Sequence, residues 1–106
     1  MGVEQSILNE IVKRVLTVVS PDKIILYGSA ATGTMTRDSD IDLLIVGPPV
    51  PNRHDTIMTI GDAIGDVNFA VDVKLIASES FEETKNVIGG IAYPAHKYGR
   101  VLYATA

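Results

Sequence analysis

The chain has 106 residues, of which 46% are hydrophobic and 21% are charged, as is typical of one globular domain with a single core. It contains no cysteine, so disulfides and thiolate metal sites are excluded. Its formal net charge of −4 disfavours stand-alone DNA or RNA binding, because such binding usually depends on a basic face that neutralises phosphate.

The N-terminal sequence predicts an amphipathic helix and shows no sign of an export signal. Apolar side chains recur at three- and four-residue intervals over residues 4–19, which predicts one wide apolar stripe. Neither a basic segment nor an apolar run typical of an export signal precedes this stripe. The longest apolar run, near residues 41–46, is much shorter than a membrane span. We therefore expect a single cytoplasmic domain over residues 1–106, without membrane contact.

The elements that follow predict an α/β fold. Residues 23–27 read as a short buried strand, and the turn-rich segment 28–39 has room for a brief helix near Ser29. The remaining predicted elements are a strand over 40–46, a helix over 53–64 capped by Asn52, a strand over 67–76, a helix over 81–87 opened by a Ser80–Glu83 capping box, and an edge strand over 101–103. The first two strands are joined by too short a link for a long crossover helix. We expect a mixed sheet of four or five strands, with helices packed mainly on one face.

Gly28, Ser29, Asp40 and Asp42 carry the clearest chemical signal. Gly28 ends a buried strand and allows a close backbone approach to a ligand, and the amides after Ser29 would face an anion at a helix N-terminus. Asp40 and Asp42 share one face of a strand, with Cα atoms about 6.5–7 Å apart. Such a carboxylate pair suits a hard cation, Mg²⁺ or Mn²⁺. The set indicates a nucleoside triphosphate site, and the apolar run 43–46 disfavours the alternative of a solvated edge strand.

Asp72 is a third candidate acid. Its strand places apolar residues at odd positions and Asp72 on the opposite face. If that strand lies beside residues 40–46, Asp72 completes a three-carboxylate cluster, where it would hold a second metal and act as general base. Lys74 shares the face of Asp72, and either an ion pair or help with phosphate charge fits its position.

The residues Leu26–Gly33 and Ser39–Val46 resemble the signature of the minimal nucleotidyltransferases, within the polymerase-beta-like nucleotidyltransferase superfamily. Asp72 matches the place of the family's third carboxylate, and residues 99–103 resemble the family's usual ending. The resemblance implies transfer of a nucleoside monophosphate from ATP or another NTP to a hydroxyl acceptor, with release of pyrophosphate. It assigns metal binding to the three aspartates, and the β and γ phosphates to Gly28 and Ser29.

The sequence departs from the family pattern in the segment between the two motifs. Thr32 and Thr36 stand where members often carry arginine. Arg37, one position after Thr36, is the nearest arginine that would bind the triphosphate in their place. Ser39, just before the first acid, would either touch the nucleotide or cap the turn.

The resemblance also implies a partner, because members of this type work beside a HEPN-domain protein, as an antitoxin that can adenylylate it. An alternative is an antitoxin-like binding module that neutralises the partner by contact, with little or no catalysis. A small-molecule nucleotidyltransferase would need an acceptor pocket that 106 residues hardly provide.

Overall fold

The computed structural model describes residues 3–33 and 40–105, in which four strands form one mixed sheet. The strands are β1 (Lys23–Tyr27), β2 (Ile41–Gly47), β3 (Val71–Ala77) and β4 (Arg100–Ala104). Their order is β3-β2-β1-β4, with β1 antiparallel to both of its neighbours and β2 parallel to β3. The expected mixed α/β sheet is confirmed, and so is the C-terminal edge strand.

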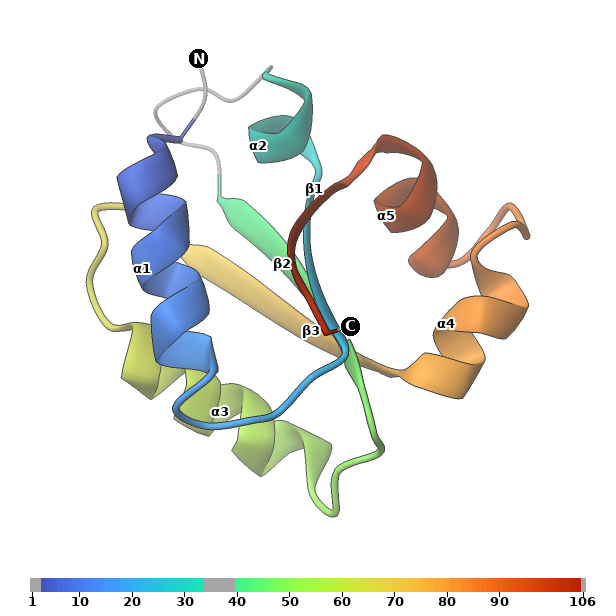
Figure 1. The fold of residues 1–106 in the computed structure, drawn as a ribbon, viewed down its shortest axis with the longest axis horizontal. Helices are drawn as coiled ribbons and strands as arrows, with labels where there is room; N and C mark the ends of the chain where they lie inside the picture. Colours follow the sequence, from blue (N-terminus) through green and yellow to red (C-terminus); the bar gives the residue numbers. More distant parts are fainter. Residues whose placement is uncertain (1–2, 34–39, 106) are drawn as a thin grey trace.

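The helices lie on both sides of this sheet (Figure 1). They are α1 (Gln5–Val15), α2 (Ser29–Thr32), α3 (Arg53–Ile64), α4 (Ser78–Thr84) and α5 (Ala92–Tyr98). The two long helices, α1 and α3, cover one face, and the shorter α4 and α5 lie against the other. No helix in the described part of the chain has both the length and the apolar character needed to cross a membrane.

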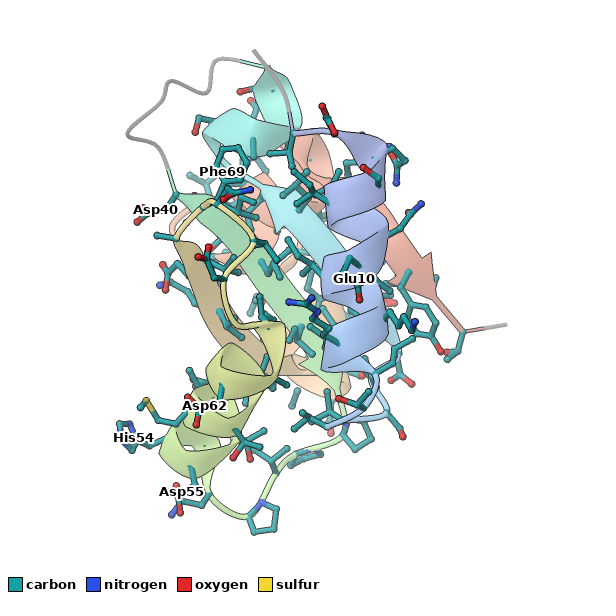
Figure 2. All side chains as sticks on the ribbon, turned by 90° about the vertical axis from the view of Figure 1, so that its left-hand side faces the viewer. Glu10, Asp40, His54, Asp55, Asp62 and Phe69 are labelled. Carbon is teal, nitrogen blue, oxygen red and sulfur yellow. The ribbon has the colours of Figure 1, made fainter. Side chains whose placement is uncertain are left out.

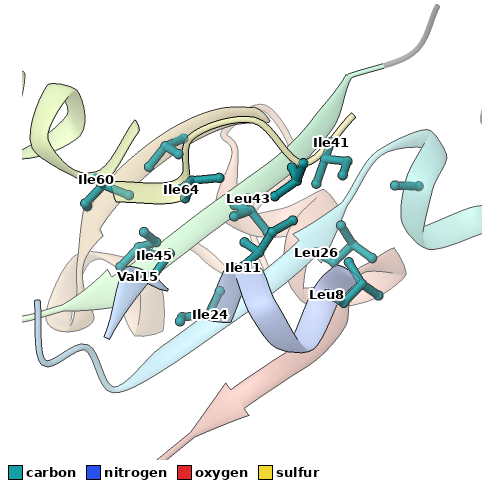
Figure 3. Packing of buried hydrophobic residues seen from close by; sticks show 13 residues of the cluster. Leu8, Ile11, Val15, Ile24, Leu26, Ile41, Leu43, Ile45, Ile60 and Ile64 are labelled. Carbon is teal, nitrogen blue, oxygen red and sulfur yellow. The ribbon is translucent and has the colours of Figure 1, made fainter. Parts of the chain in front are cut away.

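Two apolar clusters fix the sheet between its helices. The larger one joins α1 and α3 to the strands, and Figure 3 shows Leu8, Ile11, Ile24, Leu43, Ile45 and Ile64 packed there. The smaller one joins Ile25, Leu44 and Val46 to Phe81 and to two alanines of α5. Because β2 contributes side chains to both clusters, it is buried on both faces. Asp42 is the one half-buried residue in this otherwise buried strand.

The first helix ends earlier than its apolar pattern indicates. It stops at Val15, whereas the pattern predicts a helix to residue 19. The Thr17 amide and hydroxyl both bond to the Arg14 carbonyl oxygen, at 3.1 and 2.6 Å, which tightens the last turn. The β-branched run from Thr17 to Val19 has lower helix propensity than the preceding segment, which explains the early end.

The third strand begins four residues later than predicted, at Val71 rather than Val67. The Asp66 side chain accepts a hydrogen bond from the Asn68 amide at 2.8 Å, and Asn68 has a left-handed φ of 70°. Pairing with β2 starts where β2 itself starts, at Ile41 opposite Val71. Val67 is nevertheless buried in the larger cluster, so the apolar alternation marked the core side correctly but not the start of the strand.

The predicted capping box of Ser80 and Glu83 is wrong. The helix α4 begins at Ser78, with Ala77 as its N-cap, and it ends at Thr84 rather than at residue 87. The Ser78 hydroxyl donates a hydrogen bond to Asp22 and ties the start of α4 to the chain ahead of β1. By contrast, the predicted cap of α3 is confirmed, because the Asn52 side chain accepts a bond from the Asp55 amide at 3.0 Å.

Replacing Asn52 by Ala should lower the free energy of unfolding by about 1 kcal/mol, because α3 loses its side-chain cap. The matched change Ser80→Ala should stay within about 0.5 kcal/mol, because that hydroxyl caps no helix. Urea unfolding of both variants measures the difference. An equal loss in the two variants would contradict this account of the caps.

Candidate active site

Asp42 and Asp72 lie side by side on two neighbouring strands. The strands β2 and β3 run parallel, with Asp42 in register with Asp72. Neighbouring strands lie about 5 Å apart, so the two carboxylates start from adjacent positions on the same face of the sheet. The role predicted for Asp72 requires its strand, β3, to lie beside β2, and the structure confirms that placement.

Gly28 lies directly against Asp42. A Cβ at Gly28 would lie 2.5 Å from Asp42 Oδ2, and the φ of Gly28 is +71°, so only glycine fits without strain. Gly28 is also the N-cap of α2, whose first residue is Ser29. The first amides of a helix have no acceptor within that helix. The end of β1 therefore brings Gly28, and with it the start of α2, next to the carboxylate of Asp42. The amides of Ala31 and Thr32 donate to the Gly28 carbonyl oxygen, at 3.1 and 3.2 Å, so the amides of Ser29 and Ala30 are the ones that a phosphate would meet.

Asp40 lies at the outer edge of this site. It is exposed, immediately precedes β2, and points outward from the beginning of that strand in Figure 2. Its carboxylate is close enough to raise the pKa of Asp42. Arg37 and Ser39, the other two predicted nucleotide contacts, lie outside the described residues.

The electrostatics of the site centre on Asp42. Burial raises the pKa of the Asp42 carboxyl above its usual value, and the negative charges of Asp72 and Asp40 raise it further. The Lys74 ammonium opposes them and lowers the pKa. The site thus holds acidic groups that repel one another, and a positive charge placed among them is favoured.

Lys74 already supplies one positive charge. Its Nζ lies 3.1 Å from Asp72 Oδ2, and the two side chains are 48% and 47% exposed. Of the two roles open to Lys74, the ion pair is therefore present.

The carboxylates are not assembled into a ready metal cage. Within residues 3–33 and 40–105, no three acidic or histidine side chains converge closely enough to hold an ion. The donor chemistry does fit a hard divalent cation, because Asp42 and Asp72 lie in register on neighbouring strands and the charges of Asp72 and Asp40 both act on Asp42. In such a site Asp42 and Asp72 would be the ligands on the sheet, and Asp40 would be the ligand just before β2.

Sequence reasoning did not identify Tyr27 as part of this site. Tyr27 pairs in register with Asp42 and lies on β1, which flanks β2 on the side opposite Asp72. Burial, followed by the charges of Asp42 and Asp72, raises the pKa of its phenol from 10.0 to about 12. Only the register of β1 against β2 reveals this neighbour, because the sequence pattern shows Tyr27 simply as the last residue of a strand.

Raising the pH from 10 to 12 should destabilise the protein through Tyr27. The unfolded chain releases this proton near pH 10, whereas the folded chain keeps it until about pH 12, so the free energy of unfolding falls across that interval. Tyr27→Phe should make this decrease in the free energy of unfolding smaller. Tyr98→Phe, which changes an exposed ring, should leave the decrease unchanged. Urea unfolding at several alkaline pH values measures the slopes, and equal slopes for the two variants would contradict the assignment.

A separate hollow of about 470 Å³ lies at the opposite end of β2 and β3. It is bordered by the Pro48–Pro49 turn and the start of α4. One of its two acids, Asp22, accepts the hydrogen bond from Ser78. Asp42 and Asp72 are at the other end of the two strands, so the candidate site lies there rather than in the hollow.

Residues 7–93 match the nucleotidyltransferase domain family. No curated protein matches the sequence. A toxin–antitoxin crystal structure with AMP-PNP superposes with a TM-score of 0.66 at 22% identity, over 92% of this chain and 73% of the other.

Two further solved structures share the fold. A candidate nucleotidyltransferase from Sulfolobus solfataricus gives a TM-score of 0.62 at 19% identity, over 94% of this chain and 79% of the other. An MNT antitoxin in complex with a tri-AMPylated HEPN toxin from Shewanella oneidensis gives 0.53 at 19% identity, over 96% and 74%. At these identities the three superpositions establish the shared fold.

Proposed function

The chain belongs to the nucleotidyltransferase domain family, and from this premise we propose that it transfers a nucleoside monophosphate from ATP or another NTP to a hydroxyl group. The observation that carries the proposal is the register of Asp42 with Asp72, with Gly28 packed against Asp42. This arrangement joins a backbone turn suited to phosphate with facing carboxylates suited to a divalent cation.

Each residue of the site has a distinct part in the proposed reaction. Asp40, Asp42 and Asp72 would hold Mg²⁺ or Mn²⁺, which when bound stabilises negative charge on the reacting phosphate. Gly28 and Ser29 orient the β and γ phosphates with the first amides of α2, and Arg37 and Ser39 remain proposed nucleotide contacts.

Transfer follows from an in-line displacement. The acceptor oxygen forms a bond to the α-phosphorus, while the bond from that phosphorus to the oxygen bridging to the β-phosphate breaks. Pyrophosphate leaves, and the proton of the acceptor hydroxyl passes to the Asp72 carboxylate. Asp72 is suited to this step because it is about half exposed, on an edge strand that an acceptor can reach.

We propose a HEPN-domain protein as the acceptor. Two of the superposed structures are toxin–antitoxin assemblies, and one of them contains an AMPylated HEPN toxin. Asp40 and Asp72 are exposed, which suits a macromolecular hydroxyl that approaches from outside.

The test is transfer of label from α-labelled ATP to a HEPN-domain protein supplied as the proposed acceptor, with Mg²⁺ and an Asp40→Asn control. Label on the partner with the wild type, and not with the variant, is the expected result. The alternative is a binding module, which is favoured by the Lys74–Asp72 pair and the lack of a ready metal cage within the described residues. Tight binding of the partner without label from either protein would support that alternative and contradict transfer.

A further inference from the structure

The ion pair between Lys74 and Asp72 lies inside the proposed site, yet the proposed reaction gives Lys74 no part. The two residues are two positions apart on the edge strand β3, so their side chains leave the same face. Both are about half exposed, with Nζ 3.1 Å from Asp72 Oδ2. Exposed pairs of this kind contribute little stability, typically 0–1 kcal/mol, so this contact breaks at small cost.

Lys74 also acts on the rest of the acidic site. Its charge lowers the pKa of Asp42, against the effects of burial, Asp72 and Asp40. Within the described residues, its ammonium is the cation acting on Asp42. The Lys74 ammonium therefore offsets part of the repulsion among the three carboxylates.

A divalent cation held by Asp72 and the Lys74 ammonium would compete for the same carboxylate. Two cations on one carboxylate repel each other, so a bound metal would weaken the contact between the Lys74 ammonium and Asp72 Oδ2. The flexible four-carbon stem of lysine allows it to swing within the site. When the metal binds together with a nucleoside triphosphate, the phosphates bring new negative charges with which the Lys74 ammonium would pair.

We propose that Lys74 is a positioning residue that acts as an exchangeable counter-ion, pairing with Asp72 in the empty site and with the nucleotide phosphates when metal and nucleotide bind together. This inference rests on the proposed function, because it requires Asp72 to be a metal ligand. It assigns opposite effects to one side chain: Lys74 opposes binding of the metal alone and favours binding of the metal–nucleotide complex.

The test is a pair of Mn²⁺ titrations of Lys74→Gln, followed by electron paramagnetic resonance, without nucleotide and with the non-hydrolysable analogue AMP-PNP. Mn²⁺ alone should bind about fivefold more tightly than to the wild type, and Mn²⁺ with AMP-PNP about fivefold more weakly. Both differences should shrink as ionic strength rises. Lys85→Gln is the matched control. Lys85, the C-cap residue of α4, pairs with Glu82 at 2.6 Å, and its replacement changes the net charge by the same amount.

The outcomes separate this inference from the proposed function. If Asp42→Asn abolishes Mn²⁺ binding but Lys74→Gln behaves like Lys85→Gln, the role of Lys74 is overturned and the metal site stands. Shifts of the same sign in both titrations of Lys74→Gln would also overturn it. If the wild type binds Mn²⁺ no better than Asp42→Asn does, with or without AMP-PNP, both the inference and the proposed function fail.

Discussion

Replacing Asp42 by Asn should lower nucleotidyl transfer by about 100- to 1,000-fold, the scale of losing one group that stabilises developing charge. Asp42 occupies the centre of the site, on β2 between Tyr27 and Asp72, and against Gly28. Asn keeps the shape of the side chain but removes the charge that attracts a metal. Initial rates of label transfer from ATP measure the loss.

The same variant should be at least as stable as the wild type. Burial and two neighbouring carboxylates raise the pKa of Asp42, so its ionised form destabilises the folded state at neutral pH. For the wild type, this penalty should disappear as the pH falls through the raised pKa towards the ordinary value of 3.8. Asn is neutral at every pH, so Asp42→Asn should have its largest stability advantage at neutral pH and lose it in acid.

The control for this prediction is Asp62→Asn on α3, at an exposed acid outside the site. Its transfer rate should match that of the wild type, and it should lack the pH-dependent gain. Thermal unfolding at neutral and acidic pH measures stability. An Asp42→Asn protein that transfers label at the wild-type rate, or that unfolds more easily at neutral pH, would contradict the assignment of Asp42.

Replacing Gly28 by Ala should reduce both stability and transfer. A residue with a side chain pays about 1–3 kcal/mol in the backbone conformation of Gly28, with φ 71° and ψ −154°. The new Cβ would also lie 2.5 Å from Asp42 Oδ2, so the carboxylate must move. A displacement of about 1 Å in a reacting group typically costs about 100-fold in rate, which is the loss expected here.

Gly65 provides a matched control for the two effects. It has nearly the same backbone conformation, with φ 62° and ψ −147°, but the nearest atom to an added Cβ is 3.8 Å away. Gly65→Ala should therefore show the conformational loss of stability with a transfer rate close to the wild type. Urea unfolding and rate measurements on both variants separate the backbone strain from the contact with Asp42. Equal rate losses at Gly28 and Gly65 would show that contact with Asp42 is not the cause.

Local patterns were sufficient to predict the parts of the site that depend on neighbours in sequence. Gly28 at the end of β1 follows from the apolar run that precedes it, and Asp42 lies on β2 as predicted. Asp40 was expected on the same strand but immediately precedes it, because β2 begins at Ile41. The same reasoning predicted the Asn52 cap, because a capping side chain bonds to an amide three residues away.

The parts that depend on tertiary pairing could not be predicted in the same way. The place of Tyr27 beside Asp42 requires the register between β1 and β2. The start of β3 depends on the Asp66–Asn68 turn and on where β2 begins, and neither changes the apolar alternation. Ser80 and Glu83 match a capping pattern, but the helix starts at Ser78, whose hydroxyl bonds to the distant Asp22.

The most direct test of nucleotidyl transfer is to measure which phosphate of ATP reaches the acceptor. The protein, Mg²⁺ and a HEPN-domain protein, the proposed acceptor, are incubated in parallel with ATP labelled at the α-phosphate and with ATP labelled at the γ-phosphate. Attack at the α-phosphorus predicts label on the partner from the α-labelled nucleotide alone, with loss of that label in Asp42→Asn. Transfer from γ-labelled ATP, or α-label on the partner that persists in Asp42→Asn, would contradict the proposed reaction at this site.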